Sequence, residues 1–388
     1  MSRIIPTSVE IFIKDDKEYL SFSNGVGYEI SEQKTIRTNE TIYYLIEKES
    51  QIDERIITGD FKCCIFLMGV CFENKEFKEP TNFDFTIFAQ GVNFYSVTFN
   101  QNVDFESVTF TQNADFSFVT FTQDASFHSA TFIKEANFYS ATFDKYAKFN
   151  PATFTQRANF HSVTFTQQAR FEGAEFTQDA NFYLATFAQD AVFNFATFGN
   201  TVDFQSAKFN KVLGFHKVNV AEDKINTVKL NLNNTTVNRI DYNDTKFTVD
   251  NRETFLTLKS VALKQNDQIK ALEFHQQEYQ TYFKSLSRKQ FDKWILGFEY
   301  WASAFGTSTT RAIMCLIGIT LLFYLLINGF HYDTKAIIDF ISPLSHDIDT
   351  IFCNIDGWDR WLFFFYKVLQ IVLVYEIIKS FRKFSRTL

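Results

Sequence analysis

Phenylalanine recurs along this chain with a strict alternation of five-residue and six-residue steps. The series begins Phe61, Phe66, Phe72, Phe77 and continues without a gap to Phe215, so the chain carries an 11-residue repeat. Repetition at a short fixed period predicts a solenoid, in which each unit buries its apolar side chains by stacking on its neighbours. Neither a helix of period 3.6 nor a flat strand of period 2 produces this spacing, whereas a chain that turns a corner every five or six residues does.

Small apolar residues accompany the large ones. Ala or Val stands two residues before most of the repeating Phe, as in Ala114 before Phe116 and Val163 before Phe165. We expect both side chains to point inward together. Four successive Phe then close one coil, which predicts about seven coils and a stack about 34 Å long at the ~4.8 Å spacing of neighbouring strands. Its two open ends require caps.

The repeat contains characteristic runs such as ANFYSATF at 136–143. This pattern resembles the pentapeptide-repeat family over roughly residues 59–220. The resemblance implies a mainly β fold, a right-handed quadrilateral β-helix. The plain family form closes a coil in four equal steps of five, so two of the four sides here carry an extra residue, as a bulge at a corner or as a longer edge.

Composition excludes some functions. The net charge is -7, and acidic and basic residues are mixed within the repeat, which is typical of neither a polyphosphate-binding surface nor a strongly acidic one. The five Cys form no metal-binding spacing and fit a reducing cytosol. The N-terminus has no apolar segment of the kind found in a cleavable signal. No pattern of nucleophile and base, paired carboxylates or phosphate loop stands out, so we expect no enzyme, no cofactor and no metal site.

Segments on either side of the repeat read as caps. Residues 1–58 alternate apolar and polar around Asn24-Gly25, which predicts a β-hairpin within an N-terminal β cap. The Phe register fails after Phe215, where the next two expected positions hold Val220 and Asn226. Residues 221–249, with the alternating run TVKLNL at 227–232, are expected to form a C-terminal β cap or linker.

Residues 250–289 predict a long amphipathic coupling helix. Asp250 and Glu253 form a capping-box pattern, and apolar residues follow at spacings of three and four from Phe255 to Phe283, so the helix is expected to reach about Ser285. Gln265 and Gln276 interrupt the apolar stripe. Packing against the end of the solenoid and a coiled coil between subunits both remain open.

Residues 290–388 read as a membrane domain. An aromatic-rich segment at 290–307 predicts a helix at the membrane interface. Segments 312–330 and 361–378 are long and apolar enough to be transmembrane helices. Lys and Arg flank both segments on the sides away from the connecting loop, which predicts cytoplasmic termini and a two-pass protein. The outer loop is acidic, and its acidic residues include Asp347, Asp349, Asp356 and Asp359.

Polar residues in the second span are candidates for lining a pore. A charged group near the centre of a bilayer costs roughly 3 kcal/mol on insertion scales, so such residues face protein or water. Lys367 and Gln370 share a helix face with Val374, and these three residues are the pore-lining candidates. Glu376 lies close to Lys379 and is more simply explained by pairing at the helix end.

The C-terminal third resembles membrane-bound bacterial pentapeptide-repeat proteins that end in a two-helix, ion-channel-like module. The matching stretches are RETF at 252–255, ALKQND at 262–267, FGTS at 305–308 and SFRKFSR at 380–386. Two spans enclose no pathway alone, so a channel requires an oligomer, most simply a homo-tetramer. The loop contains no TVGYG potassium filter, so potassium selectivity does not carry over. Residues 336–354 are either a re-entrant segment or an ordered loop.

The solenoid surface offers ladders of residues that occupy equivalent positions in successive coils. Tyr95, Ser117, Tyr139, His161 and Tyr183 form one such ladder, and a second contains Lys145. An aromatic row at strand spacing is able to stack the bases of a nucleotide or single-stranded oligonucleotide. The alternative is a solvated face that only stabilises the solenoid.

These features predict an oligomeric channel or pore-forming effector in a bacterial cytoplasmic membrane, gated by a cytosolic solenoid. By resemblance to sensor-plus-pore effectors, the expected role is anti-phage defence under a nucleotide or oligonucleotide signal. The alternative is a membrane-tethered scaffold whose solenoid binds a partner protein. Soluble pentapeptide-repeat proteins that mimic DNA and inhibit gyrase are a third class, but they lack membrane spans.

Overall fold

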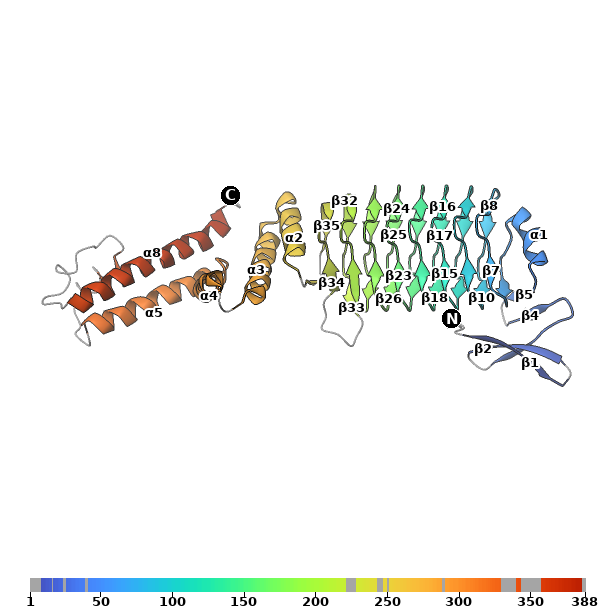
Figure 1. Cartoon of the computed structure of the whole chain (residues 1–388), viewed down its shortest axis with the longest axis horizontal. Coiled ribbons are helices and arrows are strands. Elements are labelled where there is room, and N and C mark those ends of the chain that lie inside the picture. The colour runs from blue at the N-terminus through green and yellow to red at the C-terminus, as the bar shows by residue number, and fades with distance from the viewer. Residues whose placement is uncertain are drawn as a thin grey trace. The chain divides into compact units, whose positions relative to one another are not determined.

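The computed structural model describes residues 8–15, 17–23, 26–38, 41–220, 228–242, 247–249, 251–287, 290–328, 340–342 and 357–385. The chain divides into two compact units, Met1–Thr257 and Leu258–Leu388. The first unit is a β-solenoid with an N-terminal extension, and the second is helical (Figure 1).

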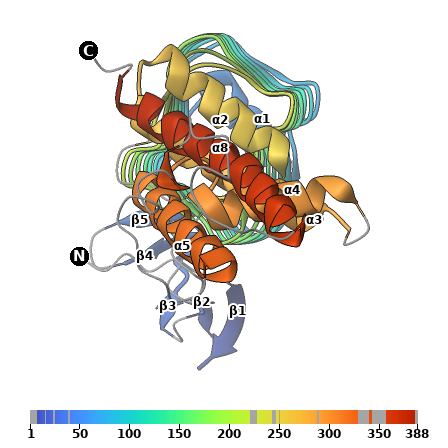
Figure 2. The ribbon, with the colours of Figure 1, turned by 90° about the vertical axis from the view of Figure 1, so that its left-hand side faces the viewer.

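Four short strands make each coil of the solenoid. The first coil consists of β6 (Cys64–Phe66), β7 (Val70–Cys71), β8 (Glu76–Phe77) and β9 (Thr81–Asn82). Each strand pairs in parallel with the equivalent strand of the next coil, so the coils superimpose in an end-on view (Figure 2). The predicted solenoid and its closure by four Phe-bearing sides are therefore confirmed.

The strands stack in four columns. The column that starts at β6 continues through β10 (Ile87–Phe88), β14 (Thr109–Phe110), β18 (Thr131–Phe132), β22 (Thr153–Phe154), β26 (Glu175–Phe176), β30 (Thr197–Phe198) and β33 (Asn219–Val220). The column from β7 continues through β11 (Val92–Asn93), β15 (Ala114–Asp115), β19 (Ala136–Asn137), β23 (Ala158–Asn159), β27 (Ala180–Asn181), β31 (Thr201–Asp203), β34 (Val228–Asn231) and β36 (Phe247–Thr248).

The other two columns are joined at their far ends. One contains β8, β12 (Thr98–Phe99), β16 (Thr120–Phe121), β20 (Thr142–Phe143), β24 (Thr164–Phe165) and β28 (Thr186–Phe187). The other contains β9, β13 (Val103–Asp104), β17 (Ala125–Ser126), β21 (Ala147–Lys148), β25 (Ala169–Arg170) and β29 (Ala191–Val192). The long strand β32 (Lys208–Gly214) pairs with β28, β29 and β35 (Thr236–Asp241).

The solenoid has about eight turns rather than seven. Strand β33 pairs with β30 in the same register as the earlier coils, with Val220 opposite Phe198. Counting Phe alone missed this turn because Val220 occupies the position where the next Phe was expected.

Stacked Phe rings fill the interior. Rings at equivalent positions of neighbouring coils lie parallel, such as Phe83 and Phe105 at 4.8 Å and 2°, whereas Phe94 meets Phe105 edge to face at 5.6 Å and 84°. The small residues that precede the Phe are buried as well, including Ala114 and Val163. Both arrangements are favourable aromatic geometries, so the large-and-small interior pattern predicted from the sequence is confirmed.

Two kinds of corner alternate around each coil. At a five-residue corner the turn closes with the Val97 N–H donating to the Phe94 carbonyl at 3.1 Å, and Ser96 between them has a positive φ of 54°. Positive φ recurs at the same place in nearly every repeat, at Cys63, Asn74, Phe85, Ser96, Ser107, Phe118, Ser129, Ser140, Ser162, Gly173, Leu184, Phe195, Ser206 and Lys217. The corners between them carry the extra residue that the alternating spacing requires.

The N-terminal end is covered by strands and a helix. Strands β1 (Val9–Lys14), β2 (Lys17–Phe22) and β3 (Gly27–Glu29) form an antiparallel sheet in which Leu20 lies opposite Tyr28. This register fits the predicted hairpin, although Asn24 and Gly25 lie outside the described residues. Strands β4 (Thr35–Arg37) and β5 (Ile42–Ile46) extend the β6 column, and helix α1 (Ser50–Thr58) follows.

The predicted single helix over 250–289 is wrong, because the structure contains two. Helix α2 (Arg252–Lys264) ends before Asn266, whose φ is 60°, and α3 (Gln268–Ser285) begins after Asp267, which accepts a hydrogen bond from Lys270 N at 3.0 Å. Asp250 lies outside the described residues, and the Asn251 side chain accepts from Thr254 N at the start of α2.

The start of α2 is bonded to the last coils. The buried hydroxyl of Thr254 accepts from Leu232 N at 2.8 Å, and the Thr257 hydroxyl donates to the Leu232 carbonyl at 3.4 Å. Of the two arrangements considered for this segment, these contacts favour packing on the solenoid end for its first turn.

Further helices of the second unit follow. Helix α4 (Phe291–Ser303) occupies the expected interfacial segment, and α5 (Thr309–Asn328) and α8 (Gly357–Ser385) occupy the two expected spans. Helices α5 and α8 lie side by side along most of their length (Figure 1).

Candidate functional site

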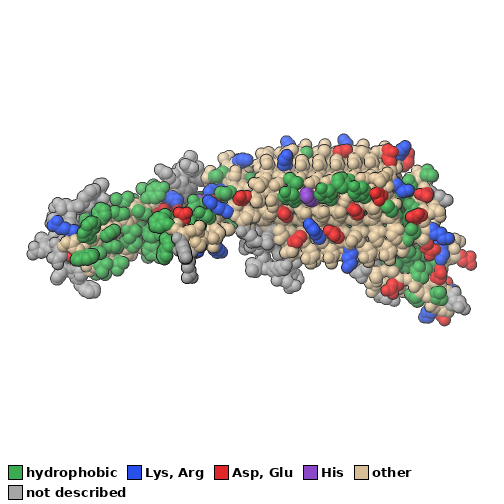
Figure 3. Space-filling model, in the orientation of Figure 1, with side chains coloured by type: hydrophobic (Ala, Val, Ile, Leu, Met, Phe, Trp, Pro, Cys, Tyr) green, Lys and Arg blue, Asp and Glu red, His purple; other side chains and the backbone are tan. Residues whose placement is uncertain are grey.

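Helices α5 and α8 are long and apolar enough to cross a membrane. The segments Thr309–Ile327 and Gly357–Phe381 have mean hydropathies of 2.1 and 1.8, and most of the residues in each segment are not buried. Hydrophobic side chains cover the visible surface of these helices (Figure 3). A core helix of a soluble protein is mostly buried instead, so this exposure favours a lipid environment.

An aromatic cluster joins the two helices. Tyr324 of α5 and Phe363 and Tyr366 of α8 surround Phe340, which is fully buried. The Phe340 and Tyr366 rings stack at 4.3 Å, and the Tyr366 and Thr320 hydroxyls are 3.2 Å apart. The short helical turn at 340–342 is therefore packed between α5 and α8.

Two predicted pore residues hold this turn. The Lys367 ammonium donates to the carbonyls of Phe340 at 3.0 Å and Ser342 at 2.7 Å, and the Gln370 amide donates to the carbonyl of Ile341. Three consecutive backbone carbonyls are thus bound by one face of α8. Rings of Phe340, Phe363 and Tyr366 surround the ammonium at 5.1–6.0 Å.

The turn lies far from the end of α8. Tyr366 and Lys367 follow Gly357 by nine and ten residues, which corresponds to about 14–15 Å along a helix. Residues 340–342 consequently lie beside the interior of α8 and not beside its first turn. The sequence indicated Lys367 and Gln370 but not their partners. Those partners are backbone carbonyls, which every residue has, so residue type does not show which of them accepts the hydrogen bonds.

The remaining predicted residues of this module are more dispersed. Val374 is half-buried on the same face of α8 as Lys367 and Gln370, and Asp359 is half-buried in the first turn of that helix. Asp347, Asp349 and Asp356 lie outside the described residues. A role for Lys367, Gln370 and Val374 in lining a pore stays a prediction.

A second polar cluster ties α8 to α4. The buried Glu376 carboxylate accepts from the Ser303 hydroxyl at 2.6 Å and lies 3.7 Å from Lys379 Nζ, which also pairs with Glu299. The simpler explanation offered for Glu376, pairing near the helix end, therefore describes its surroundings. Pairing and hydrogen bonding together compensate the burial of its charge.

A third cluster lies between α2 and α3. Lys259 Nζ is 2.9 Å from His275 Nδ1 and 3.4 Å from the buried carboxylate of Glu278. Burial and, next, the Lys259 ammonium lower the pKa of His275 below its ordinary value of 6.5, so the imidazole is neutral at pH 7. Nδ1 of the neutral imidazole accepts a hydrogen bond from the Lys259 ammonium, which links the two helices.

The predicted aromatic ladder on the solenoid differs from expectation at one position. Ser117 is buried and bonds to Asp115, and the exposed ring of Phe118 stands instead between Tyr95 at 5.4 Å and Tyr139 at 5.3 Å. Phe118 is the positive-φ residue of its corner, and this conformation directs its ring into the row.

The row continues through two further rings. His161 meets Tyr139 and Tyr183 edge to face, each at 5.0 Å. Figure 3 shows a line of hydrophobic side chains with a histidine among them along this face of the solenoid. Lys145 is exposed on a different corner, in the segment between Phe143 and Phe149, so the structure does not add it to the row.

The repeat also matches a known family. A family model described as Pentapeptide repeats (9 copies) matches residues 105–153 and 149–197. Residues 105–197 of the solenoid are pentapeptide repeats. Comparisons with curated proteins and with solved structures found no match. Pentapeptide-repeat solenoids are typically non-enzymatic scaffolds, and no catalytic family was identified.

Three carboxylates gather at one corner of the pentapeptide-repeat domain. Oxygen atoms of Asp84, Asp104 and Glu106 lie within 4.8 Å of one another. Burial first, and then the Asp104 charge, raise the pKa of Asp84 from its ordinary 3.8 to about 6, although Lys62 Nζ lies 3.8 Å away. We did not anticipate this cluster from the sequence, although Asp84 and Glu106 occupy equivalent positions in neighbouring coils and therefore stack.

Proposed function

We propose that this chain is the subunit of an oligomeric membrane channel whose cytosolic pentapeptide-repeat domain controls opening. The observation that carries the proposal is the binding of three successive carbonyls at 340–342 by Lys367 and Gln370 beside the middle of α8. If α8 spans the bilayer, the 340–342 turn is a re-entrant segment near the centre of a hydrocarbon layer about 30 Å thick.

Polar contacts at that depth favour a channel over an anchor. Backbone departs from regular helix at membrane depth only where protein buries it or where it lines a water-filled cavity. A membrane anchor needs neither an ammonium group nor a re-entrant turn in its spans. The buried Oε1 of Gln370 accepts no hydrogen bond from the part of the chain that the structure describes, and water or an ion in a pathway would supply its partner.

A ring of subunits, most simply four, completes the pathway because two spans enclose none. Arg311 at the start of α5 and Lys379 near the end of α8 support cytoplasmic termini in a bacterial inner membrane. By its resemblance to sensor-plus-pore effectors, we extend the proposal to anti-phage defence, in which opening depolarises the cell.

The trigger would bind the aromatic row of the solenoid, which we define as Tyr95, Phe118, Tyr139, His161 and Tyr183. A nucleotide or oligonucleotide would stack on these rings. Neighbouring rings meet edge to face, however, and so cover part of one another's stacking surfaces.

This geometry favours a second candidate function, a membrane-tethered scaffold. Exposed ring edges suit contacts with a partner protein, in which aromatic side chains are common anchors. In that case α5 and α8 only attach the solenoid to the bilayer, and the polar contacts of Lys367 serve stability alone.

Two substitutions on adjacent residues of α8 separate these functions. Lys367→Met removes the ammonium that binds Phe340 and Ser342, whereas Val368→Met changes a side chain that is 47% exposed on another face. Single-channel current is recorded in planar bilayers from the protein purified in detergent, with oligonucleotides added if the bilayer is silent. We expect discrete conductance that Lys367→Met alters and Val368→Met preserves.

The mass of the detergent-purified protein provides the second measurement. A tetramer that conducts supports the channel. A monomer that stays silent with every added nucleotide would overturn the channel in favour of the scaffold.

A further inference from the structure

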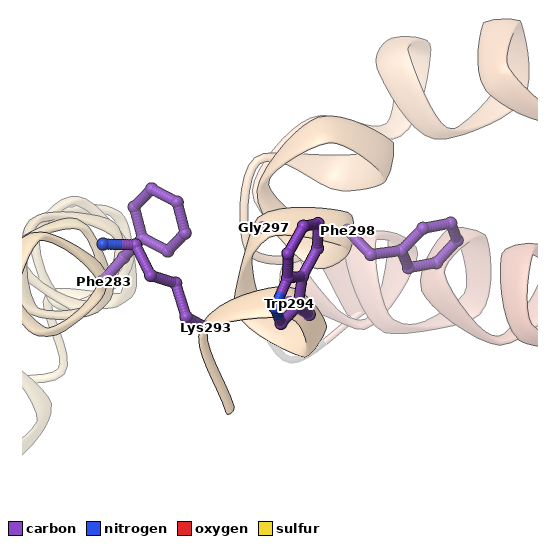
Figure 4. A pocket seen from close by; sticks show the side chains of 5 residues that line it. All are labelled: Phe283, Lys293, Trp294, Gly297 and Phe298. Atoms are coloured by element: carbon purple, nitrogen blue, oxygen red, sulfur yellow. The ribbon is translucent and has the colours of Figure 1, made fainter. Parts of the chain in front are cut away.

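A cavity of about 630 Å³ lies between α3 and α4. Phe283, Lys293, Trp294, Gly297 and Phe298 line it. Figure 4 shows the Lys293 side chain reaching from α4 toward Phe283 of α3, with Trp294 and Gly297 on the α4 side. The volume is in the roughly 300–1,000 Å³ range of small-molecule sites, and the lining is apolar except for one cation.

Lys293 is the polar group of this cavity. Its Nζ donates to the Leu286 carbonyl at 2.6 Å and lies 5.3 Å from the centre of the Phe283 ring. The ammonium has three N–H groups, and this carbonyl uses one of them. Among the described residues that line the cavity none is acidic, so these residues combine apolar walls with one positive charge.

The helix that carries the cavity has the character of a membrane-interface helix. Phe291, Trp294, Ile295 and Trp301 of α4 are 51–75% exposed. Trp at a helix surface is typical of the headgroup region of a bilayer. Cytoplasmic leaflets of membranes are negatively charged, and they attract basic groups next to a span.

We propose that this cavity binds an anionic phospholipid, with an acyl chain against Phe283, Gly297 and Phe298 and the phosphate at Lys293. The inference rests on the proposed placement of α5 and α8 in a bilayer. Charge selects the class of lipid, because a zwitterionic headgroup offers Lys293 no net negative charge.

Gly297 makes the cavity possible. A Cβ at this position would lie 3.5 Å from Phe283, an ordinary contact, so a larger side chain would extend into the space without displacing backbone. Leu is also a better helix former than Gly. Gly297→Leu is therefore a filling variant that we expect to fold.

Bromine-labelled lipids test the site through Trp294. The full-length protein is reconstituted in phosphatidylcholine vesicles containing phosphatidylglycerol, with bromine on the acyl chains of one lipid or of the other. The difference between wild type and Trp294→Phe isolates the fluorescence of Trp294. We expect brominated phosphatidylglycerol to quench it at least twofold more than its mole fraction predicts.

The matched variants give the contrast. Gly297→Leu and Lys293→Gln should both reduce the quenching to the mole-fraction value, whereas Lys284→Gln, an exposed lysine of α3 outside the lining, should not. Equal quenching by both lipids, or an excess that persists in Gly297→Leu, would overturn the lipid site while leaving the channel intact. Failure of the protein to float with vesicles would overturn both.

Discussion

The hydroxyl of Ser303 donates a 2.6 Å hydrogen bond to the carboxylate of Glu376 and so joins the end of α4 to α8. The same hydroxyl accepts from Gly306 N at 2.7 Å, which makes it a bridge between the turn after α4 and α8. Movement of α4 would therefore be transmitted to α8 close to Lys379.

Removal of this hydroxyl should weaken the helical unit. Ser303→Ala leaves the buried Glu376 carboxylate without one donor, and an unsatisfied buried group costs about 1–3 kcal/mol. We expect that loss of unfolding free energy in a titration with sodium dodecyl sulfate followed by circular dichroism. Thr310→Ala, at an exposed position in the first turn of α5, is the control. An equal effect of both substitutions would contradict the bridge.

Gly59 should be indispensable to the N-terminal end of the solenoid. Its φ is 68°, and a Cβ there would overlap the Pro80 carbonyl oxygen. Left-handed conformation alone costs a residue with a side chain about 1–2 kcal/mol. Adding the overlap, Gly59→Ala should lower the unfolding free energy by about 2 kcal/mol or more.

Gly91 provides the comparison for Gly59. A Cβ at Gly91 would lie 3.6 Å from the Asn113 carbonyl oxygen, an ordinary contact, so Gly91→Ala should leave the thermal unfolding temperature almost unchanged. If the two Ala variants melt at the same temperature, the close approach of Pro80 to Gly59 does not affect the stability of the solenoid.

The carboxylate cluster should make the solenoid less stable as pH rises. Because the pKa of Asp84 is raised to about 6 by folding, the folded state binds its proton more tightly than the unfolded state. The unfolding free energy then falls between about pH 4 and pH 6. Asp84→Asn removes the charge and should raise the melting temperature at pH 7.5 but much less at pH 5. Asp144→Asn, outside the cluster, should show no such pH dependence.

The α2–α3 pair should respond to pH in the opposite direction. The lowered pKa of His275 means that the unfolded state binds its proton more tightly, so stability is lost as pH falls below about 6.5. Lys259 from α2 and Lys379 from α8 both oppose protonation, and Glu278 favours it.

Hydrogen exchange of α2 and α3 measures this effect. We expect faster exchange at pH 5.5 than at pH 7.5, after correction for intrinsic rates, and a smaller difference in His275→Gln. Identical pH dependence in both proteins would assign the effect to other groups.

The solenoid was predictable because its information is periodic. Phe116 and Phe138 occupy equivalent places, so a pattern seen once is checked many times along the chain, and side-chain size alone determines what lies inside. The additional coil keeps the same register, since β33 pairs with β30 and Val220 lies opposite Phe198.

The helical unit was predictable in its elements but not in its contacts. Hydropathy located α5 and α8, yet the partners of Lys367 are backbone carbonyls, which every residue possesses. The break between α2 and α3 depends on the left-handed conformation of Asn266. Asn adopts this conformation more readily than most residues, but an Asn in the sequence does not by itself predict it. Phe118 joins the aromatic row from the positive-φ position of its repeat, next to the position that the ladder of equivalent residues singled out.

Because equivalent coils stack in register, each complete coil adds one strand spacing to the length of the solenoid. Deleting one complete coil would rejoin the chain on the same side of the stack and shorten the distance between the two caps by one strand spacing. Deleting half a coil would keep the Phe pattern unbroken but rejoin the chain on the opposite side of the solenoid. The number of complete coils therefore sets the length of the solenoid. Complete coils can be added or removed while the chain still leaves on the same side of the stack.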